Sequence, residues 1–162
     1  MTDPLLAKVL TCSDGVIAGT RENKSGEALV ATLTAAGYAV VEQRVVADGV
    51  FSVRDALIEM SDGFAGLIMT TGGTGFGPRD LTPEGTLAAI ERQAPGLSEA
   101  IRVASNTEGR NFGMLSRAVA GTRGATLIVN SPGSSGGAVE AFEAVAAVIP
   151  HALDLLSGGR PH

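Results

Sequence analysis

The chain has 162 residues, a formal net charge of −5, one cysteine and two histidines. That length suits a single domain with a hydrophobic core, and we expect residues 1–162 to form it. The acidic balance argues against nucleic-acid binding, and no apolar run reaches the ~20 residues of a membrane span. One cysteine excludes an internal disulfide, and two histidines cannot build a histidine-rich metal centre. The first residues also lack the basic start of a secretory signal, so we expect a cytoplasmic protein.

The first half of the chain alternates apolar runs typical of buried strands with segments of helical periodicity. In chain order, the pattern predicts a strand over 5–12, a helix over 25–36, a strand over 38–46, a helix over 51–62 and a strand over 65–71.

The second half continues the alternation with one ambiguous segment. Helices are predicted over 83–92 and 97–105, a short strand with turns within 114–124, a strand over 125–130, and helices over 138–149 and 151–156. Alternation of this kind is typical of an α/β fold, in which helices cover both faces of a mostly parallel sheet.

Polar loops follow the predicted strands at their carboxyl ends. Ser13-Asp14 follows the first strand, Asp48-Gly49 the second, a glycine loop (residues 72–77) the third, and residues 130–137 the last. Ligands of open α/β sheets bind outside the carboxyl ends of the strands. We therefore expect these four loops to form one pocket, with backbone amides for phosphate and carboxylates for a hard cation such as Mg²⁺.

The glycine loop carries the strongest signal. It has four glycines in six residues, and Arg79 and Asp80 follow it directly. Residues 82–84 resemble a helix start with Thr82 as the N-cap. A strand, uncovered amides, a charged pair and a helix start suit a phosphate-bearing ligand. The loop fits neither GxGxxG, because Pro78 takes the third glycine position, nor the GxxxxGK[ST] phosphate loop.

Structural roles are open alternatives for several of these residues. The glycine loop could be a tight turn, Asp80 could cap or pair with Arg79, and Asp48-Gly49 is an ordinary turn signal. Residues 131–133 could be a plain turn into a helix. Cys12 is predicted to be a buried thiol at a strand end. Three cations are candidate phosphate contacts or solvated surface residues: Arg21, Lys24 and Arg117.

Several motifs together closely resemble the molybdopterin adenylyltransferase family. They are TTGGTG at residues 70–75, RDLTPE at 79–84, Ser13-Asp14, Lys24-Ser25-Gly26, and Asn130-Ser131-Pro132-Gly133. Family members share their fold with the molybdopterin-binding domain of gephyrin and of molybdenum insertases. Asn130-Ser131 departs from the Asn-Leu that is common before the late Pro-Gly, and residues 135–137 depart from the usual pattern as well.

The resemblance implies a three-layer α/β/α sandwich, commonly assembled as a homotrimer, and a molybdenum insertase as a partner. It also implies a reaction in which AMP passes from Mg²⁺-ATP to the terminal phosphate of molybdopterin and pyrophosphate leaves. That phosphate is already ionised near neutral pH, so no strong general base is needed. Catalysis then depends on positioning and on neutralising charge.

The resemblance also assigns residues. Asp48 and Asp80 match the family's two key aspartates, which implies catalysis and Mg²⁺ binding. The implied ligand contacts are Gly72, Gly73, Thr74 and Gly75 through backbone amides, Ser131, Pro132, Gly133 and Ser134 on the pterin side, and Ser13 and Asp14 beside the nucleotide or the pterin.

Two other functions are compatible with the sequence. One is a non-catalytic molybdopterin-binding paralogue that keeps the pocket but does not transfer AMP. The other is a trimeric scaffold domain like that of gephyrin. The presence of Asp80 favours the enzyme, since some relatives that lack activity have lost this aspartate.

Overall fold

A computed structural model describes residues 2–107 and 109–161. Within them a six-stranded sheet has the order β2-β1-β3-β6-β5-β4. Its first four strands are mutually parallel, and at one edge β5 pairs antiparallel with β6 and β4 pairs antiparallel with β5. The strand bounds are β1 (Leu6–Cys12), β2 (Ala39–Val46), β3 (Gly66–Thr71), β4 (Arg92–Gln93), β5 (Ala120–Arg123) and β6 (Thr126–Ser131).

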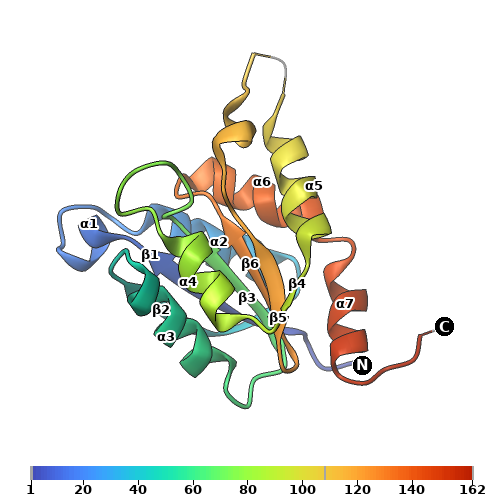
Figure 1. Cartoon of the computed structure of the whole chain (residues 1–162). Coiled ribbons are helices and arrows are strands. Elements are labelled where there is room, and N and C mark those ends of the chain that lie inside the picture. The colour runs from blue at the N-terminus through green and yellow to red at the C-terminus, as the bar shows by residue number, and fades with distance from the viewer. Residues whose placement is uncertain (1, 108, 162) are drawn as a thin grey trace.

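Helices cover both faces of the sheet, which confirms the predicted three-layer α/β/α sandwich (Figure 1). One face carries α2 (Lys24–Ala35), α5 (Pro95–Ser105), α6 (Ser135–Val145) and α7 (Ile149–Leu156), and the other carries α3 (Val50–Ser61) and α4 (Thr82–Ala89). Two short elements lie at the edges, α1 (Asp14–Ile17) after β1 and the 3-10 helix η1 (Phe112–Leu115) between α5 and β5. No helix in the described ranges is both long and apolar enough to span a membrane.

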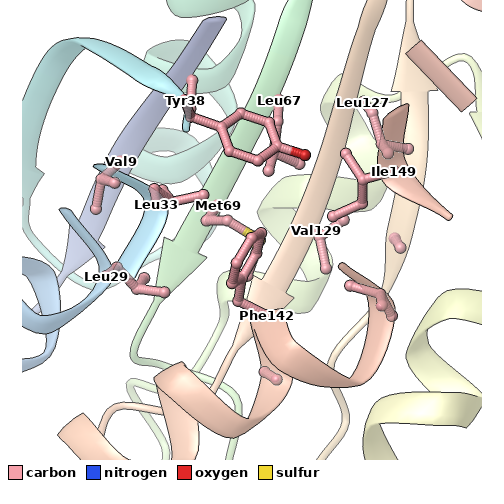
Figure 2. Packing of buried hydrophobic residues seen from close by; sticks show 14 of the residues in the cluster. Val9, Leu29, Leu33, Tyr38, Leu67, Met69, Leu127, Val129, Phe142 and Ile149 are labelled. Carbon is pink, nitrogen blue, oxygen red and sulfur yellow. The ribbon is translucent and has the colours of Figure 1, made fainter. Parts of the chain in front are cut away.

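The larger core lies between the sheet and the layer formed by α2, α6 and α7. Figure 2 shows Leu33 and Phe142 from two of these helices packed toward Met69 of β3. Tyr38 meets Phe142 edge to face, with ring centroids 5.9 Å apart. Because β3 and β6 are sandwiched between two helix layers, every residue of both strands is buried.

The second core lies on the opposite face, under α3 and α4. Alternate residues of the central strands, such as Ile68 and Ile128, point into it and meet Leu57 and Met60 of α3. The two cores hold the parallel strands rigidly, so the loops at their carboxyl ends are fixed relative to one another.

The structure corrects the boundaries of two predicted helices. The helix expected over 83–92 ends at Ala89, because Ile90 is extended and Arg92–Gln93 pairs with β5. The helix expected over 138–149 begins at Ser135 instead, since Ser134 caps it by accepting a hydrogen bond from Gly137 N. It ends at Val145. The predicted N-cap Thr82 is wrong, because Leu81 holds that position and Thr82 begins the helix.

Candidate functional site

A cavity of about 780 Å³ opens at the carboxyl ends of the parallel strands. It brings together the loops after β1, β2, β3 and β6, as the alternation of strands and helices predicts. The start of α2 forms a further wall. The lining consists of residues 11–13, 16, 21–22, 24–25, 48, 71–75, 80 and 133–135.

The glycine loop has a backbone that side chains would not allow. Gly72 and Gly73 have φ of 95° and 67°. A Cβ at Gly72 would lie 2.3 Å from Cys12 O, and one at Gly73 would lie 2.3 Å from Thr82 Oγ1 and 3.0 Å from Asp48 Oδ1. Both residues must therefore be glycine for the loop to reach the sheet and Asp48.

The same loop presents free donors. Over the described part of the chain, the backbone amides of residues 73–76 donate no hydrogen bond, while Gly72 N is engaged by Ser131 O at 3.2 Å. Residues 71–75 line the cavity. Consecutive unpaired amides of this kind form a concave site for an anion.

Asp48 is held in place by Asp14 and Arg79. Asp14 N donates to Asp48 Oδ2 (2.9 Å), and Asp48 N donates to Asp14 Oδ1 (3.1 Å). Arg79 donates from Nε and Nη2 to the Asp14 carboxylate (3.0 and 3.1 Å) and from Nη2 to Asp48 O (2.7 Å). Hydrogen bonding to Arg79 lowers the pKa of Asp14. This cluster ties together the loops after β1, β2 and β3.

One oxygen of the Asp48 carboxylate is unpaired within the residues that the structure describes. Asp48 Oδ1 is buried and has no hydrogen-bond partner among residues 2–107 and 109–161. Burial raises the pKa of Asp48, and the negative charges of Asp14 and Asp80 raise it further. The influence of Asp80 means that the two predicted key carboxylates are close enough to interact.

Asp80 folds back over the glycine loop. Its Oδ2 accepts a hydrogen bond from Gly77 N at 2.9 Å, and this oxygen lies against Gly75. Asp48 and Asp80 both line the cavity beside the free amides.

In the described residues, no group of three or more His, Cys, Asp or Glu side chains could hold a metal. Two carboxylates suit Mg²⁺, which commonly takes its other oxygen ligands from substrate phosphates and water.

The other predicted contacts divide into two groups. Ser13, Gly133 and Ser134 line the cavity. By contrast, Ser131 is buried and donates to Thr70 O at 2.6 Å, and Pro132 O accepts from Thr71 Oγ1 at 2.7 Å. These two residues support the wall from behind, because β6 extends through Ser131 rather than ending at Asn130. Asp14 also stabilises the cavity wall, because it binds Asp48 and Arg79.

The structure adds lining residues that the sequence did not single out as contacts. Thr11 and Cys12 end β1 at the cavity, and Ser25 enters it from the first turn of α2. Thr11 Oγ1 donates to Asn23 Oδ1, which also accepts from Gly26 N as the cap of α2. Ser25 lies in one of the motifs that carry the family resemblance, and that motif could have identified it. Cys12 is buried, as predicted, and burial raises the pKa of its thiol to about 12.

The candidate phosphate contacts also separate. Arg21 and Lys24 line the cavity. Arg117 instead lines a different cavity, of about 330 Å³, and donates to Gly75 O of the glycine loop and to Asp80 O just after it.

Comparison with known proteins identifies the family to which most of the chain is similar. A family model described as "Probable molybdopterin binding domain" matches residues 8–151. A molybdopterin adenylyltransferase of Helicobacter pylori is 37% identical over 153 residues, which are 93% of this chain and 86% of that protein.

Two further similarities extend this result. The Drosophila melanogaster molybdenum cofactor synthesis protein cinnamon is 44% identical over 90 residues, 56% of this chain but only 15% of that longer protein. The crystal structure of the molybdopterin biosynthesis enzyme MoaB from Thermus thermophilus superposes with a TM-score of 0.86 at 39% identity, covering 95% of this chain and 97% of that one. The chain therefore belongs to the family of molybdopterin-binding domains of molybdenum cofactor biosynthesis.

Proposed function

We propose that this chain is a molybdopterin adenylyltransferase. An oxygen of the molybdopterin phosphate attacks the α-phosphorus of ATP, a P–O bond forms, and the bond to the β-phosphate breaks so that pyrophosphate leaves with the electron pair. The observation that carries this proposal is the pairing, in one cavity, of the Asp48 and Asp80 carboxylates with the free amides of the glycine loop. The similarity to a protein named molybdopterin adenylyltransferase supports it.

The chain's own residues act by binding and positioning. The amides of residues 73–75, which line the cavity, donate hydrogen bonds to phosphoryl oxygens and offset the charge that accumulates as one anion approaches another. Arg79 and Asp14 keep Asp48 oriented, with its unpaired Oδ1 held beside Gly73 of the glycine loop. Arg21 and Lys24 add positive charge at the cavity wall.

Asp48 Oδ1 and the Asp80 carboxylate are the groups that would hold Mg²⁺. The fit is chemical, since an unpaired buried carboxylate oxygen is stabilised by a cation, and hard oxygen ligands are those that Mg²⁺ prefers. When bound, Mg²⁺ neutralises phosphate charge.

A domain that only binds pterin, or serves as a scaffold, is the alternative. Such a domain needs the donor amides but has no need of two interacting carboxylates beside them. The orientation of Asp48 by two other residues, Asp14 and Arg79, favours the enzyme. Assembly as a homotrimer and pairing with a molybdenum insertase stay predictions.

Incubation with molybdopterin, ATP and Mg²⁺ tests the function. We expect pyrophosphate release and adenylylated pterin in equal amounts. Asp80→Asn is the matched variant, because Asn keeps an oxygen for Gly77 N while removing the charge. It should abolish transfer and largely retain pterin binding. Pterin binding by the wild-type chain without pyrophosphate would select the non-catalytic alternative, and full turnover by Asp80→Asn would refute the role of Asp80.

A further inference from the structure

The glycine loop is bound by a side chain that reaches it from outside the cavity. Arg117 donates from Nε to Gly75 O at 2.9 Å and from Nη2 to Asp80 O, and its backbone N donates to Thr74 O at 2.9 Å. Its Nη1 pairs with Glu84 Oε1 in the first turn of α4. Three carbonyl groups of the loop region and one carboxylate therefore converge on Arg117.

These contacts determine where the loop amides point. In a trans peptide unit the C=O and N–H groups point in opposite directions. The carbonyls of Thr74 and Gly75 point toward Arg117, so the amides of Gly75 and Phe76 point away from it. Both amides belong to the set that donates no hydrogen bond within the described ranges. Arg117 thus accounts for the direction in which half of this donor set is presented.

Arg117 is itself anchored to the body of the fold. Arg102 of α5 donates from Nη1 to the carbonyls on either side of it, Ala118 O at 2.8 Å and Ser116 O at 3.4 Å. Two residues further on, Val119 N donates to the buried Asn130 Oδ1 of β6 at 3.1 Å. The backbone that carries Arg117 is therefore fixed on both the helix and the sheet, and the arginine holds the loop against a rigid frame.

We propose that Arg117 is the positioning residue that sets the glycine loop for phosphate binding. The proposal rests on the function proposed above, since it takes the ligand of the loop to be phosphate-bearing. Arg117 acts through the loop: its donors bind carbonyls rather than the ligand, and its positive charge behind the amides favours an anion in front of them. A planar guanidinium is required, because a lysine ammonium is a point charge that cannot reach two carbonyls and a carboxylate in this fork geometry.

The test is binding of inorganic pyrophosphate, by isothermal titration calorimetry in Mg²⁺ buffer without ATP or pterin. Arg123→Gln is the matched control, because Arg123 also donates to one carbonyl, Ala89 O at 2.9 Å, but at the far end of α4. We expect Arg117→Gln to weaken pyrophosphate binding at least tenfold and Arg123→Gln to change it less than twofold. Wild-type affinity in Arg117→Gln overturns the proposal, as does a wild-type chain that binds no pyrophosphate.

Hydrogen–deuterium exchange supplies a readout that a purely stabilising role would not move. The hydrogen-bonded amides of Gly77 and Asp80 should exchange faster in Arg117→Gln, while amides of β3 and β6 exchange as in the wild-type chain. If Arg117→Gln unfolds, Arg117→Lys decides. It should bind pyrophosphate at least threefold more weakly with faster loop exchange, and wild-type behaviour in both measurements overturns the proposal.

The outcome is separable from that of the adenylyl-transfer assay. A wild-type chain that binds pyrophosphate through an Arg117-dependent loop, yet forms no adenylylated pterin, supports the positioning role and refutes the enzyme. Transfer that is equally fast in wild-type and Arg117→Gln chains supports the enzyme and refutes the positioning role.

Discussion

Asp14 and Asp48 hold each other through reciprocal hydrogen bonds, each backbone amide donating to the other's carboxylate at 2.9 and 3.1 Å. The arrangement uses one oxygen of Asp48 and leaves Oδ1 facing Gly73. Arg79 completes it by binding the Asp14 carboxylate and Asp48 O. Two like charges are thereby kept together at the end of the sheet, because each carboxylate accepts a hydrogen bond from one backbone amide and that of Asp14 also binds the Arg79 guanidinium.

The first prediction concerns this cluster. Asp14→Ala removes the acceptor for Asp48 N and the partner of Arg79, so Asp48 loses its fixed orientation. We expect kcat/KM for adenylyl transfer to fall about 10- to 100-fold, since small misplacements of a catalytic group have costs of this size. Arg79→Ala should have a similar effect, and the double variant should be little worse than either single one.

A double-mutant cycle checks this coupling. Arg54 and Asp55 form a surface ion pair on α3 at 2.7 Å, and the same cycle on this pair is the control. We expect no effect on kcat/KM there, because exposed pairs contribute little. Independent, additive losses at Asp14 and Arg79 would contradict the shared role.

The second prediction concerns Gly73. In Gly73→Ala the new Cβ meets Thr82 Oγ1 and Asp48 Oδ1 at a φ of 67°, so strain and crowding add. We expect the free energy of unfolding in urea to fall by about 3 kcal/mol and pyrophosphate binding to be lost.

Gly63→Ala separates the cost of a non-glycine residue at positive φ from the cost of steric crowding. Gly63 has a nearly equal φ of 61°, and a Cβ there meets nothing within 4 Å. It should lose about 1 kcal/mol and bind pyrophosphate normally. Equal losses in the two variants would show that crowding around Gly73 is unimportant.

Much of the fold could be predicted because long elements have a clear period and short ones do not. The buried run of β3 and the apolar stripe of α3 were both recognisable. The strand β4 was missed, since two residues carry no periodicity and pair only because Gly121 lets Arg92 O approach closely. The helix α1 is one turn long and was missed for the same reason.

The candidate site was predictable to the extent that topology determines it. A parallel sheet brings the loops after its strands to one edge, which placed Asp48 and Asp80 at the same cavity. The sequence could not show whether a residue faces the cavity or lies behind its wall. Ser131 was expected in the pocket, but one further residue of strand turns its hydroxyl toward Thr70 O. Arg117 reaches the loop from its outer side for reasons that only the tertiary structure reveals.

The third prediction concerns the buried amide of Asn130. Its Nδ2 donates to Thr70 Oγ1 (3.0 Å) and Thr86 Oγ1 (2.9 Å), and its Oδ1 accepts from Val119 N. Asn130→Ala leaves these groups without their partner in a dry interior, so we expect the free energy of unfolding to fall by about 3 kcal/mol. Urea denaturation checks this. The exposed Asn111→Ala should stay within about 0.5 kcal/mol, and a similarly small change at Asn130 would contradict the structural role of the network.

The fourth prediction concerns Cys12, the chain's one cysteine, so any thiol signal belongs to it. Burial raises its pKa to about 12, above an unfolded value of about 8.5. Only the thiolate reacts with Ellman's reagent, and at pH 8 roughly one native thiol in 10,000 is ionised against about one in four when unfolded. We expect very slow labelling of the native chain at pH 8 and rapid labelling in urea.

Between pH 8 and 10 the labelling rate of the native chain should rise about tenfold per pH unit while circular dichroism stays constant, because each unit increases the thiolate fraction tenfold. A native rate independent of pH would show that access, not ionisation, limits the reaction, and rapid native labelling at pH 8 would contradict the buried environment at the end of β1.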